Sequence, residues 1–431
     1  MWPQCRKVLR CAQDDSVPHR GVVTIATSNP EGIDGPAAWR AAWIVLAALS
    51  ISFGSPLLIV VGLKPIQEAL GTDRSTIALA GSLAWFGTAV GGIVMGWLAD
   101  KVGVRVTLAF GAVMSAGGLA VSSLGPIWAL YVGHGLMLGL LGNGAIYAPL
   151  LVYVSRWFER RRGTAIALIS SGQYIAGIVW PALFERGIST WGWQTVMLGY
   201  AAVVAVAILP VTLLLKPLPP AAVPHAAHAG GANGYRVAGM HPNTAQVMLC
   251  IAGFCCCVPM AIPQAHLVAF CSDIGIIATR GAAMLSVMLA AAFISRQLWG
   301  VLADRIGGLR TVLFGSMAQA VCISGFLMTQ DEAGLFFVAA AFGLGFAGII
   351  PAYSVAVRDL FSAAQASWRI PLTLSTAQAG MAFGNWFAGR LYDHYGYYKP
   401  AFASGIGFNL LNVLIIGSLV MLLVGARRKA A

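Results

Sequence analysis

Charged residues are scarce in this sequence. Of its 431 residues, 10% are Asp, Glu, Lys or Arg and 58% are hydrophobic, with a mean hydropathy of +0.78. A soluble domain carries charge on about a quarter of its residues. The apolar residues form stretches of about 20 or more, the length that crosses a hydrocarbon core about 30 Å thick. The composition therefore excludes a soluble globular protein and predicts a membrane protein that crosses the bilayer many times.

The sequence also lacks the patterns of a catalytic or metal site. Its eight cysteines show no zinc spacing with histidines, and the run 255–257 lies in an apolar stretch, where cysteine packs as a small hydrophobe. We find no nucleophile–base pair and no metal cluster on one membrane face, so we expect no enzyme, no cofactor and no metal. The net charge of +12 does not indicate nucleic-acid binding, because the cations sit in short loops between apolar stretches.

Twelve spans are predicted, all helical because lipid leaves no partner for an unpaired backbone group. They cover residues 39–62, 76–98, 106–124, 127–154, 163–185, 193–215, 244–270, 279–302, 309–329, 334–357, 371–389 and 400–424. Gly and Pro interrupt "GSPLL" (54–58) and "GNGAIYAPL" (142–150). Such breaks are tolerated where a helix lines a cavity.

The longest connection, residues 216–242, is rich in Pro, Ala and Gly and separates six spans from six. We therefore predict an all-α membrane protein with two pseudo-symmetric six-helix halves. The expected parts are a cytoplasmic tail (1–38), an N-terminal half (39–215), a cytoplasmic linker (216–242), a C-terminal half (243–424) and a second tail (425–431).

The lysines and arginines predict the orientation. Twenty fall on the side of the two termini, six on the opposite side, and Arg296 lies within a span, which together make the 27 of the chain. Because cytoplasmic loops carry the excess of positive charge, both termini are expected in the cytoplasm. We expect a plasma membrane location, as in a bacterial inner membrane.

One short motif occurs twice. "GWLADKVG" (96–103) and "GVLADRIG" (300–307) share five of eight residues, and each follows the second span of its half. Gly96 and Gly300 are expected to permit close helix packing. Gly103 and Gly307 are expected to permit a tight turn.

The aspartates of the motif, Asp100 and Asp304, end a helix, where the helix dipole disfavours a carboxylate. Nearby cations or the next helix should hold them. A duplicated loop of this kind favours a hinge with a function over a plain hairpin.

The duplicated motif resembles the signature of loops 2–3 and 8–9 in the major facilitator superfamily. The resemblance covers nearly the whole chain: twelve spans, the division into two halves and the repeated motif. It implies a transporter in which these loops make cytoplasmic gate contacts. The residues to which it assigns that role are Gly96, Asp100, Gly103, Arg105, Gly300, Asp304, Gly307 and Arg310.

Four further stretches resemble one branch of that superfamily, the monocarboxylate porters, which include bacterial oxalate/formate exchangers. They are "DGPAAWRAAW" (34–43), "RWFERRRGTAIALISSGQYIAG" (156–177), "HLVAFCSDIGI" (266–276) and "GRLYDHYGYYKPAF" (389–402). The resemblance adds a gating role for Arg160, Arg161 and Arg162. Binding of lipid headgroups is the alternative for these three cations.

Arg296 is the residue that carries the chemistry. It precedes Asp304 by eight residues, which places it about 12 Å deeper and near the midplane. An arginine there costs about 3 kcal/mol even on mild scales, so it should face protein or water and hold an anion. When Asp100 is aligned with Asp304, the other half has Gly92 at this position, so the arginine is not part of the duplicated scaffold.

The fifteen acidic residues all fall in tails, loops or span ends, so a structural ion pair with Arg296 is not expected. Backbone carbonyls or hydroxyls could solvate the guanidinium. The preferred interpretation is that the substrate brings the carboxylate, which the planar guanidinium binds. The resemblance agrees, because it implies that the eighth-span arginine binds the substrate carboxylate.

The sequence departs from the family at three places. Ala292 replaces an aspartate of some members, Leu57 after Pro56 replaces a lysine, and span eleven lacks the second cation of the oxalate exchangers. One fixed cation suits one carboxylate and disfavours a dicarboxylate.

Weaker candidates accompany Arg296. Asn143 and Tyr147 lie four residues apart on the fourth span, and Tyr353 and Asn385 lie on spans ten and eleven. His134 and His266 are the titratable groups left for proton coupling. A residue of this kind is more often packed or bonded locally than part of a site, and that alternative stands for each of the six.

We therefore expect a secondary transporter of small monocarboxylates, with proton symport first and anion exchange second. The expected partners are a small carboxylate, protons or a counter-anion, and membrane lipids, and we expect a monomer. One rival is an efflux pump for larger organic anions or drugs. The other is a membrane-embedded sensor of organic acids, disfavoured because no soluble signalling domain is recognised.

Overall fold

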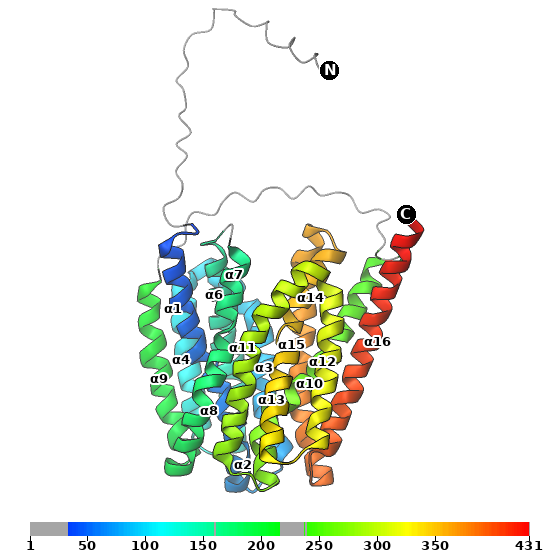
Figure 1. The fold of residues 1–431 in the computed structure, drawn as a ribbon. Helices are drawn as coiled ribbons and strands as arrows, with labels where there is room; N and C mark the ends of the chain where they lie inside the picture. Colours follow the sequence, from blue (N-terminus) through cyan, green and yellow to red (C-terminus); the bar gives the residue numbers. More distant parts are fainter. Residues whose placement is uncertain (1–32, 159–160, 216–236, 238, 431) are drawn as a thin grey trace, which may run out of the picture.

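The computed structural model describes residues 33–158, 161–215, 237 and 239–430 (Figure 1). The first bundle of helices comprises α1 (Pro36–Ser52), α2 (Gly54–Leu70), α3 (Arg74–Val102), α4 (Val104–Ser122), α5 (Ile127–Leu130), the π-helix η1 (Tyr131–Asn143), α6 (Gly144–Ser155), α7 (Arg162–Ser170), α8 (Gly172–Trp191) and α9 (Trp193–Leu214). The second comprises α10 (Pro242–Asp273), α11 (Ala278–Ile306), α12 (Gly308–Met328), α13 (Glu332–Phe346), α14 (Ile349–Leu360), α15 (Ala363–Tyr395) and α16 (Lys399–Ala430). The expected all-α membrane fold is confirmed.

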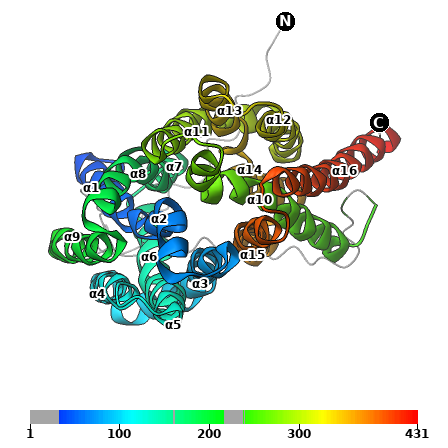
Figure 2. The same ribbon diagram turned by 90° about the horizontal axis from the view of Figure 1, so that it is seen from below.

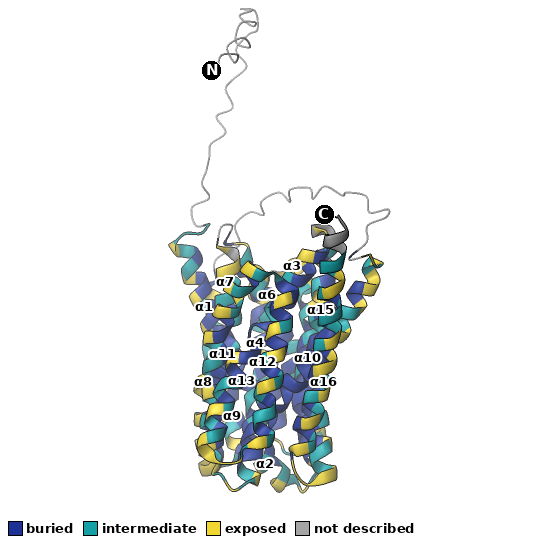
Figure 3. Ribbon diagram, turned by 45° about the vertical axis from the view of Figure 1, so that its right-hand side comes forward, coloured by how far each residue is buried: buried dark blue, intermediate teal, exposed yellow. Residues whose placement is uncertain are grey.

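Eleven helical stretches of the described chain are long and apolar enough to cross a membrane. The helix α15 corresponds to the remaining predicted span, and its polar residues, Arg369, Gln378 and Asn385 among them, lower its hydropathy. Large apolar side chains such as Leu213, Val321 and Phe337 are exposed on the outside, while the buried residues lie within (Figure 3). This distribution suits a protein surrounded by lipid.

Several helices extend beyond the predicted spans. The first span was expected to end at residue 62, yet α2 continues to Leu70, and α15 extends past both ends of 371–389. The last span was expected to end at 424, but α16 continues to Ala430. Hydropathy marks only the lipid-facing part of a helix, and helical hydrogen bonding continues through polar residues beyond it. The first 32 residues and most of the expected linker lie outside the described residues.

The helices form two bundles, α1–α9 and α10–α16, with α2, α3 and α8 of the first facing α10, α11 and α15 of the second (Figure 2). The helix α1 begins and α16 ends at the same face, which we call the terminal face (Figure 1). The opposite face, where α2 ends and α3 begins, is the distal face.

The breaks expected from Gly and Pro lie beside a cavity. The helices α1 and α2 meet at Phe53, and the fourth span changes from π-helix to α-helix between Asn143 and Gly144. Phe53, Pro56 and Tyr147 all line the cavity between the bundles.

Candidate functional site

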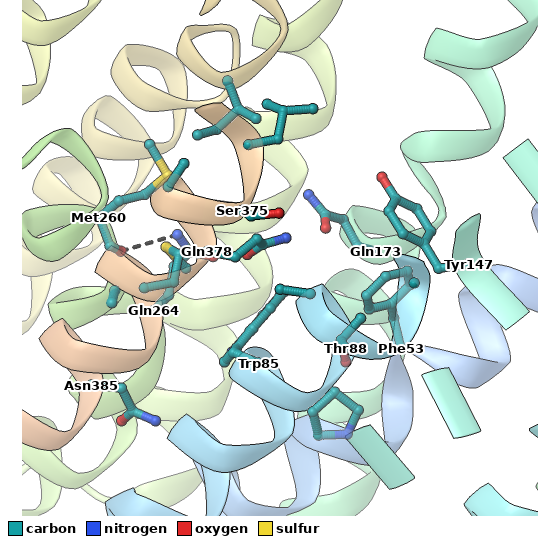
Figure 4. A pocket seen from close by; sticks show the side chains of 18 of the residues that line it. Phe53, Trp85, Thr88, Tyr147, Gln173, Met260, Gln264, Ser375, Gln378 and Asn385 are labelled. Atoms are coloured by element: carbon teal, nitrogen blue, oxygen red, sulfur yellow. Dashed lines mark hydrogen bonds between the residues drawn. The ribbon is translucent and has the colours of Figure 1, made fainter. Parts of the chain in front are cut away.

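A cavity of about 540 Å³ separates the two bundles. Its wall is mostly apolar and includes the aromatic rings of Phe53, Trp85, Tyr174 and Phe346. The polar side chains of the wall are Thr88, Tyr147, Gln173, Gln264, Arg296, Ser375, Gln378 and Asn385. Figure 4 shows Tyr147 and Gln173 of the first bundle opposite Gln264, Ser375 and Gln378 of the second.

Arg296 lies in the wall, on α11, ten residues or about 15 Å from the helix end at Ile306. Its side chain is buried, with 8% of the residue exposed. Nη1 donates to the carbonyl oxygen of Ser170 at 3.1 Å and to its hydroxyl at 3.2 Å, and Nε donates to the carbonyl of Ala347 at 3.5 Å. The guanidinium carbon lies 4.6 Å from the ring centre of Tyr174, a cation–π contact.

Both carbonyls are available because helices break there. Ser170 ends α7, and the N–H of Tyr174 bonds to the carbonyl of Ser171 rather than to that of Ser170. Ala347 lies in the break between α13 and α14. These breaks supply acceptors to Arg296 that a continuous helix would use internally.

The alternative of solvation by carbonyls and hydroxyls is thus realised in part. Among the described residues, however, Nη2 of Arg296 makes no hydrogen bond, and the cavity wall contains no Asp or Glu. Gly92, which occupies the equivalent position in the first half, also lines the cavity. The cavity therefore carries its positive charge on one side only.

Of the weaker candidates, Tyr147 and Asn385 line the cavity, whereas Asn143 and Tyr353 do not. The Asn143 side chain accepts a hydrogen bond from Ser52 at 2.6 Å. Tyr353 donates to Asn412 at 2.9 Å. Both are buried pairs that join helices within one bundle. The prediction missed this because spacing along one helix does not indicate which neighbouring helix a side chain contacts.

The two histidines lie outside the cavity wall. His134 is fully buried, with Nδ1 2.8 Å from the Ser122 hydroxyl. His266 is also fully buried, between the Tyr398 hydroxyl at 2.9 Å and the Asn385 carbonyl at 2.8 Å. Neither ring lies where a bound substrate would contact it directly.

The duplicated loops lie at the terminal face. Asp100 pairs with Arg156 at 3.3 Å, and Nε of Arg105 donates to the Leu215 carbonyl at 2.7 Å. In the second copy, Asp304 and Arg310 are exposed. Gly103 and Gly307 have φ of 88° and 84°, a conformation that glycine adopts without strain.

The expectation of close packing at Gly96 and Gly300 is wrong for this conformation. A Cβ at either position would meet no atom within 4 Å. The contacts found around these loops join residues of one bundle, such as Asp100 with Arg156 and Gly308 with Asp359. Among the described residues, no neighbouring helix packs against a Cβ at either glycine, and the motif alone does not show how far apart the helices lie.

Three cations, Arg160, Arg161 and Arg162, were expected to take part in gating. The backbone N–H of Arg161 donates to the Asp34 carboxylate at 3.3 Å. Arg162 begins α7, and Arg160 lies outside the described residues.

Sequence reasoning missed Gln173, Gln264, Ser375 and Gln378, and the contacts of Ser170 and Tyr174 with Arg296. A signal was present, since each glutamine interrupts an otherwise apolar span, where a polar side chain is costly. Ser170 could not be found this way, because its contribution depends on a helix break.

The chain is similar to fungal and animal transporters. It is 26% identical to the MFS-type transporter pynF of Aspergillus niger over 264 residues, 60% of this chain and 58% of that protein, so the match spans less than two thirds of this relative. It is 22% identical to an MFS-type transporter of Aspergillus fumigatus over 419 residues, 93% of this chain and 94% of that one. It is 31% identical to monocarboxylate transporter 9 of Mus musculus over 186 residues, 43% of this chain and 36% of that one.

Solved structures share the fold. The nucleoside transporter NupG matches with a TM-score of 0.69 at 15% identity, over 88% of this chain and 98% of that chain. A bacterial homologue of the lysosomal transporter Spinster, in an inward-facing conformation, matches with a TM-score of 0.66 at 14% identity, over 91% and 96% of the two chains. At these identities, the likeness concerns the fold alone.

The model of the Major Facilitator Superfamily matches residues 42–367, which is most of both bundles. The relatives reported above are transporters from fungi and animals, so they give no support to the expected bacterial inner membrane. The twelve spans, the duplicated loop and this match agree, and the chain belongs to the Major Facilitator Superfamily.

Proposed function

We propose that this protein is a secondary transporter that carries monocarboxylates through the cavity by alternating access. One observation carries the proposal: Arg296 is a buried cation in the wall of a cavity whose wall contains no carboxylate. A permanent charge at this depth is costly without an anion, and a substrate carboxylate would supply one.

The surroundings of Arg296 prepare it for this role. Ser170 and Ala347 hold Nη1 and Nε, and the Tyr174 ring lies against the guanidinium. The two N–H groups of Nη2 remain for the substrate. Tyr147 and Gln173 line the same cavity and can donate further hydrogen bonds to a bound acid.

The rest of the wall suits an acid with an apolar body. Aromatic and aliphatic side chains cover most of it, with Gln264, Ser375 and Gln378 as polar groups on the second bundle. We propose that the carboxylate binds Arg296, that the apolar body packs between Trp85 and Phe346, and that the glutamines select polar substituents.

We further propose that both termini are cytoplasmic and that transport is coupled to protons by symport, with anion exchange as the alternative. The orientation rests on the positive charge of the terminal side. The proton-coupling role proposed for His134 and His266 would act indirectly, since both are buried outside the cavity wall.

The test is uptake of labelled lactate, pyruvate and aromatic acids into proteoliposomes, with and without a pH gradient. Accumulation that follows the pH gradient supports symport, and accumulation that needs a trapped counter-anion supports exchange. No accumulation of any acid, or accumulation unchanged in Arg296→Ala, contradicts the proposal. Binding without accumulation would favour the sensor.

The cavity volume favours a second candidate, export of larger organic anions. Pockets for drug-sized ligands measure about 300–1,000 Å³, and the cavity here has about 540 Å³. If bulky aromatic acids compete for binding and three-carbon acids do not, the larger substrates are the physiological class.

A further inference from the structure

A partly buried cluster of polar residues joins the two bundles at the distal face. Its centre is Arg74, the first residue of α3, which is 2% exposed. The guanidinium forms an ion pair with Asp273 at the end of α10, and Nη1 also donates to the Tyr398 hydroxyl at 3.0 Å. Arg74 belongs to the first bundle and both partners belong to the second.

Two more contacts strengthen this junction. Lys64 of α2 lies 3.2 Å from Asp273, so the carboxylate receives two cations from the first bundle. The guanidinium carbon of Arg74 lies 3.8 Å from the ring centre of Tyr392 on α15. The Arg74 side chain is 3% exposed and that of Asp273 is 16% exposed, so water screens their attraction less than that of a fully exposed pair.

The second bundle also caps a helix of the first. Asp393, near the end of α15, accepts hydrogen bonds from the backbone N–H groups of Arg74 at 2.8 Å and Ser75 at 2.9 Å. A carboxylate there satisfies unpaired N–H groups and complements the helix dipole. The N-cap residue of α3 itself, Asp73, makes no such hydrogen bond. In this conformation the start of α3 is therefore capped by a residue of the second bundle.

A chain of hydrogen bonds connects this cluster to the cavity. The Tyr398 hydroxyl lies 2.9 Å from Nδ1 of His266, and Nε2 of His266 lies 2.8 Å from the carbonyl of Asn385. The Asn385 side chain lines the cavity and donates to the carbonyl of Ala78, on the first bundle, at 3.1 Å. If Tyr398 donates to Nδ1 and Nε2–H donates to Asn385, every group in the chain is satisfied.

From these contacts we infer that Arg74, Asp273, Asp393 and Tyr398 form the gate that closes the cavity at the distal face, and that His266 links this gate to Asn385 in the cavity wall. We call these four residues the distal gate. The inference rests on the alternating access included in the proposed function. His266 is a positioning residue in this scheme, since it holds Tyr398 and Asn385 in register.

Access to the cavity tests the gate without any substrate. Ser375, in the wall, is replaced by Cys, and an impermeant maleimide is added to one side of proteoliposomes, with label at residue 375 read by peptide mass spectrometry. The tail residues Cys5 and Cys11 precede α1 and report which face the reagent reaches. With the gate intact, Ser375→Cys should react from the terminal face and be protected from the distal face.

Arg74→Gln should raise distal labelling about tenfold or more, because removing the buried cation that joins the bundles shifts the equilibrium away from the paired conformation. Asp273 keeps Lys64 as a partner in this variant. A second variant, Asp393→Ala, should act in the same direction and is gentler, since Asp73 can take over as the cap. The control is Arg280→Gln, which breaks an exposed pair with Glu332, 3.4 Å apart, within the second bundle at the same face. It should leave labelling unchanged.

Unchanged distal labelling in both Arg74→Gln and Asp393→Ala would overturn the gate, as would equal effects of Arg280→Gln. His266→Leu should also raise distal labelling if His266 links the gate to the cavity, and no effect would remove it from the scheme. Because labelling does not require transport, it can support the distal gate even if no monocarboxylate is carried. Conversely, uptake that depends on Arg296 supports the proposed function even if the labelling experiment contradicts the distal gate.

Discussion

At the scale of single residues, the contrast between Arg296 and Gly92 defines the site. The two positions are equivalent in the repeat and both line the cavity, but only one carries charge. The carboxylate of the substrate is therefore expected to be bound through the second bundle, which carries Arg296. The sequence alone indicated the depth of Arg296 and the scarcity of acids there, and the structure adds the groups that hold it.

The first prediction concerns this arginine. Arg296→Ala should lower uptake by about 10- to 100-fold, because a charge-assisted hydrogen bond contributes about 1.5–3 kcal/mol. Arg296→Lys should recover only part of the loss, since lysine lacks the planar fork that binds a carboxylate in two places. Initial rates of uptake measure both variants. Full activity of Arg296→Lys would show that only the charge matters.

The glutamines should act on selectivity rather than on uptake as a whole. Gln378→Leu should raise KM about fivefold for acids with a hydroxyl or amide remote from the carboxylate, the loss expected for one hydrogen bond. Acids with a purely apolar body should be affected little. Competition assays with matched acids measure the difference, and Gln330→Leu, exposed in the loop after α12, is the control. Equal effects on both classes of acid would argue against a selective role.

At the scale of the helices, glycines of α3 behave in opposite ways. A Cβ at Gly91 would clash with the backbone carbonyl of Leu140 on η1, whereas a Cβ at Gly96 would meet no neighbour. In this conformation Gly91 therefore allows α3 to pack closely against η1, whereas Gly96 is not part of a close helix contact.

Gly91→Ala should therefore lower the free energy of unfolding by about 1–3 kcal/mol, the cost of overpacking a close contact. Gly96→Ala, five residues further along the same helix, should change it little. Thermal unfolding in detergent measures both variants. Equal unfolding temperatures would show that α3 and η1 separate easily.

A larger side chain at the terminal face should affect transport without affecting folding. A Cβ at Gly96 or Gly300 meets no atom within 4 Å in the described conformation, but Gly96→Leu and Gly300→Leu should impair turnover if the bundles meet there when the terminal face closes. Gly199→Leu on α9, another glycine without neighbours, is the control. Expression and unfolding temperature should match the parent chain while uptake falls at least severalfold. Unimpaired uptake would show that the two loops stay apart throughout the cycle.

At the scale of the whole molecule, the site lies between two bundles, and most of the polar contacts between them in the described part of the chain lie toward the distal face. A ligand that bridges the bundles should stabilise their association. At about 100 times its Kd, a bound acid should add about 2.7 kcal/mol to the free energy of unfolding, which thermal unfolding with and without the acid measures. Arg296→Ala should abolish this shift, and a shift that persists in the variant would locate binding elsewhere.

The sequence by itself determined the membrane fold, the twelve spans, the repeated loop and the isolation of Arg296, because these follow from hydropathy, spacing and the placement of charge along the chain. Tertiary structure decided which polar residues meet: Tyr147 and Asn385 line the cavity, while Asn143 and Tyr353 are bonded within their bundles. It also decided that Arg74, which lies between the predicted spans 39–62 and 76–98, is buried and contacts residues about 200 or more positions away. Burial and pairing across bundles depend on how helices far apart in the sequence pack together, and no local pattern of residues encodes that packing.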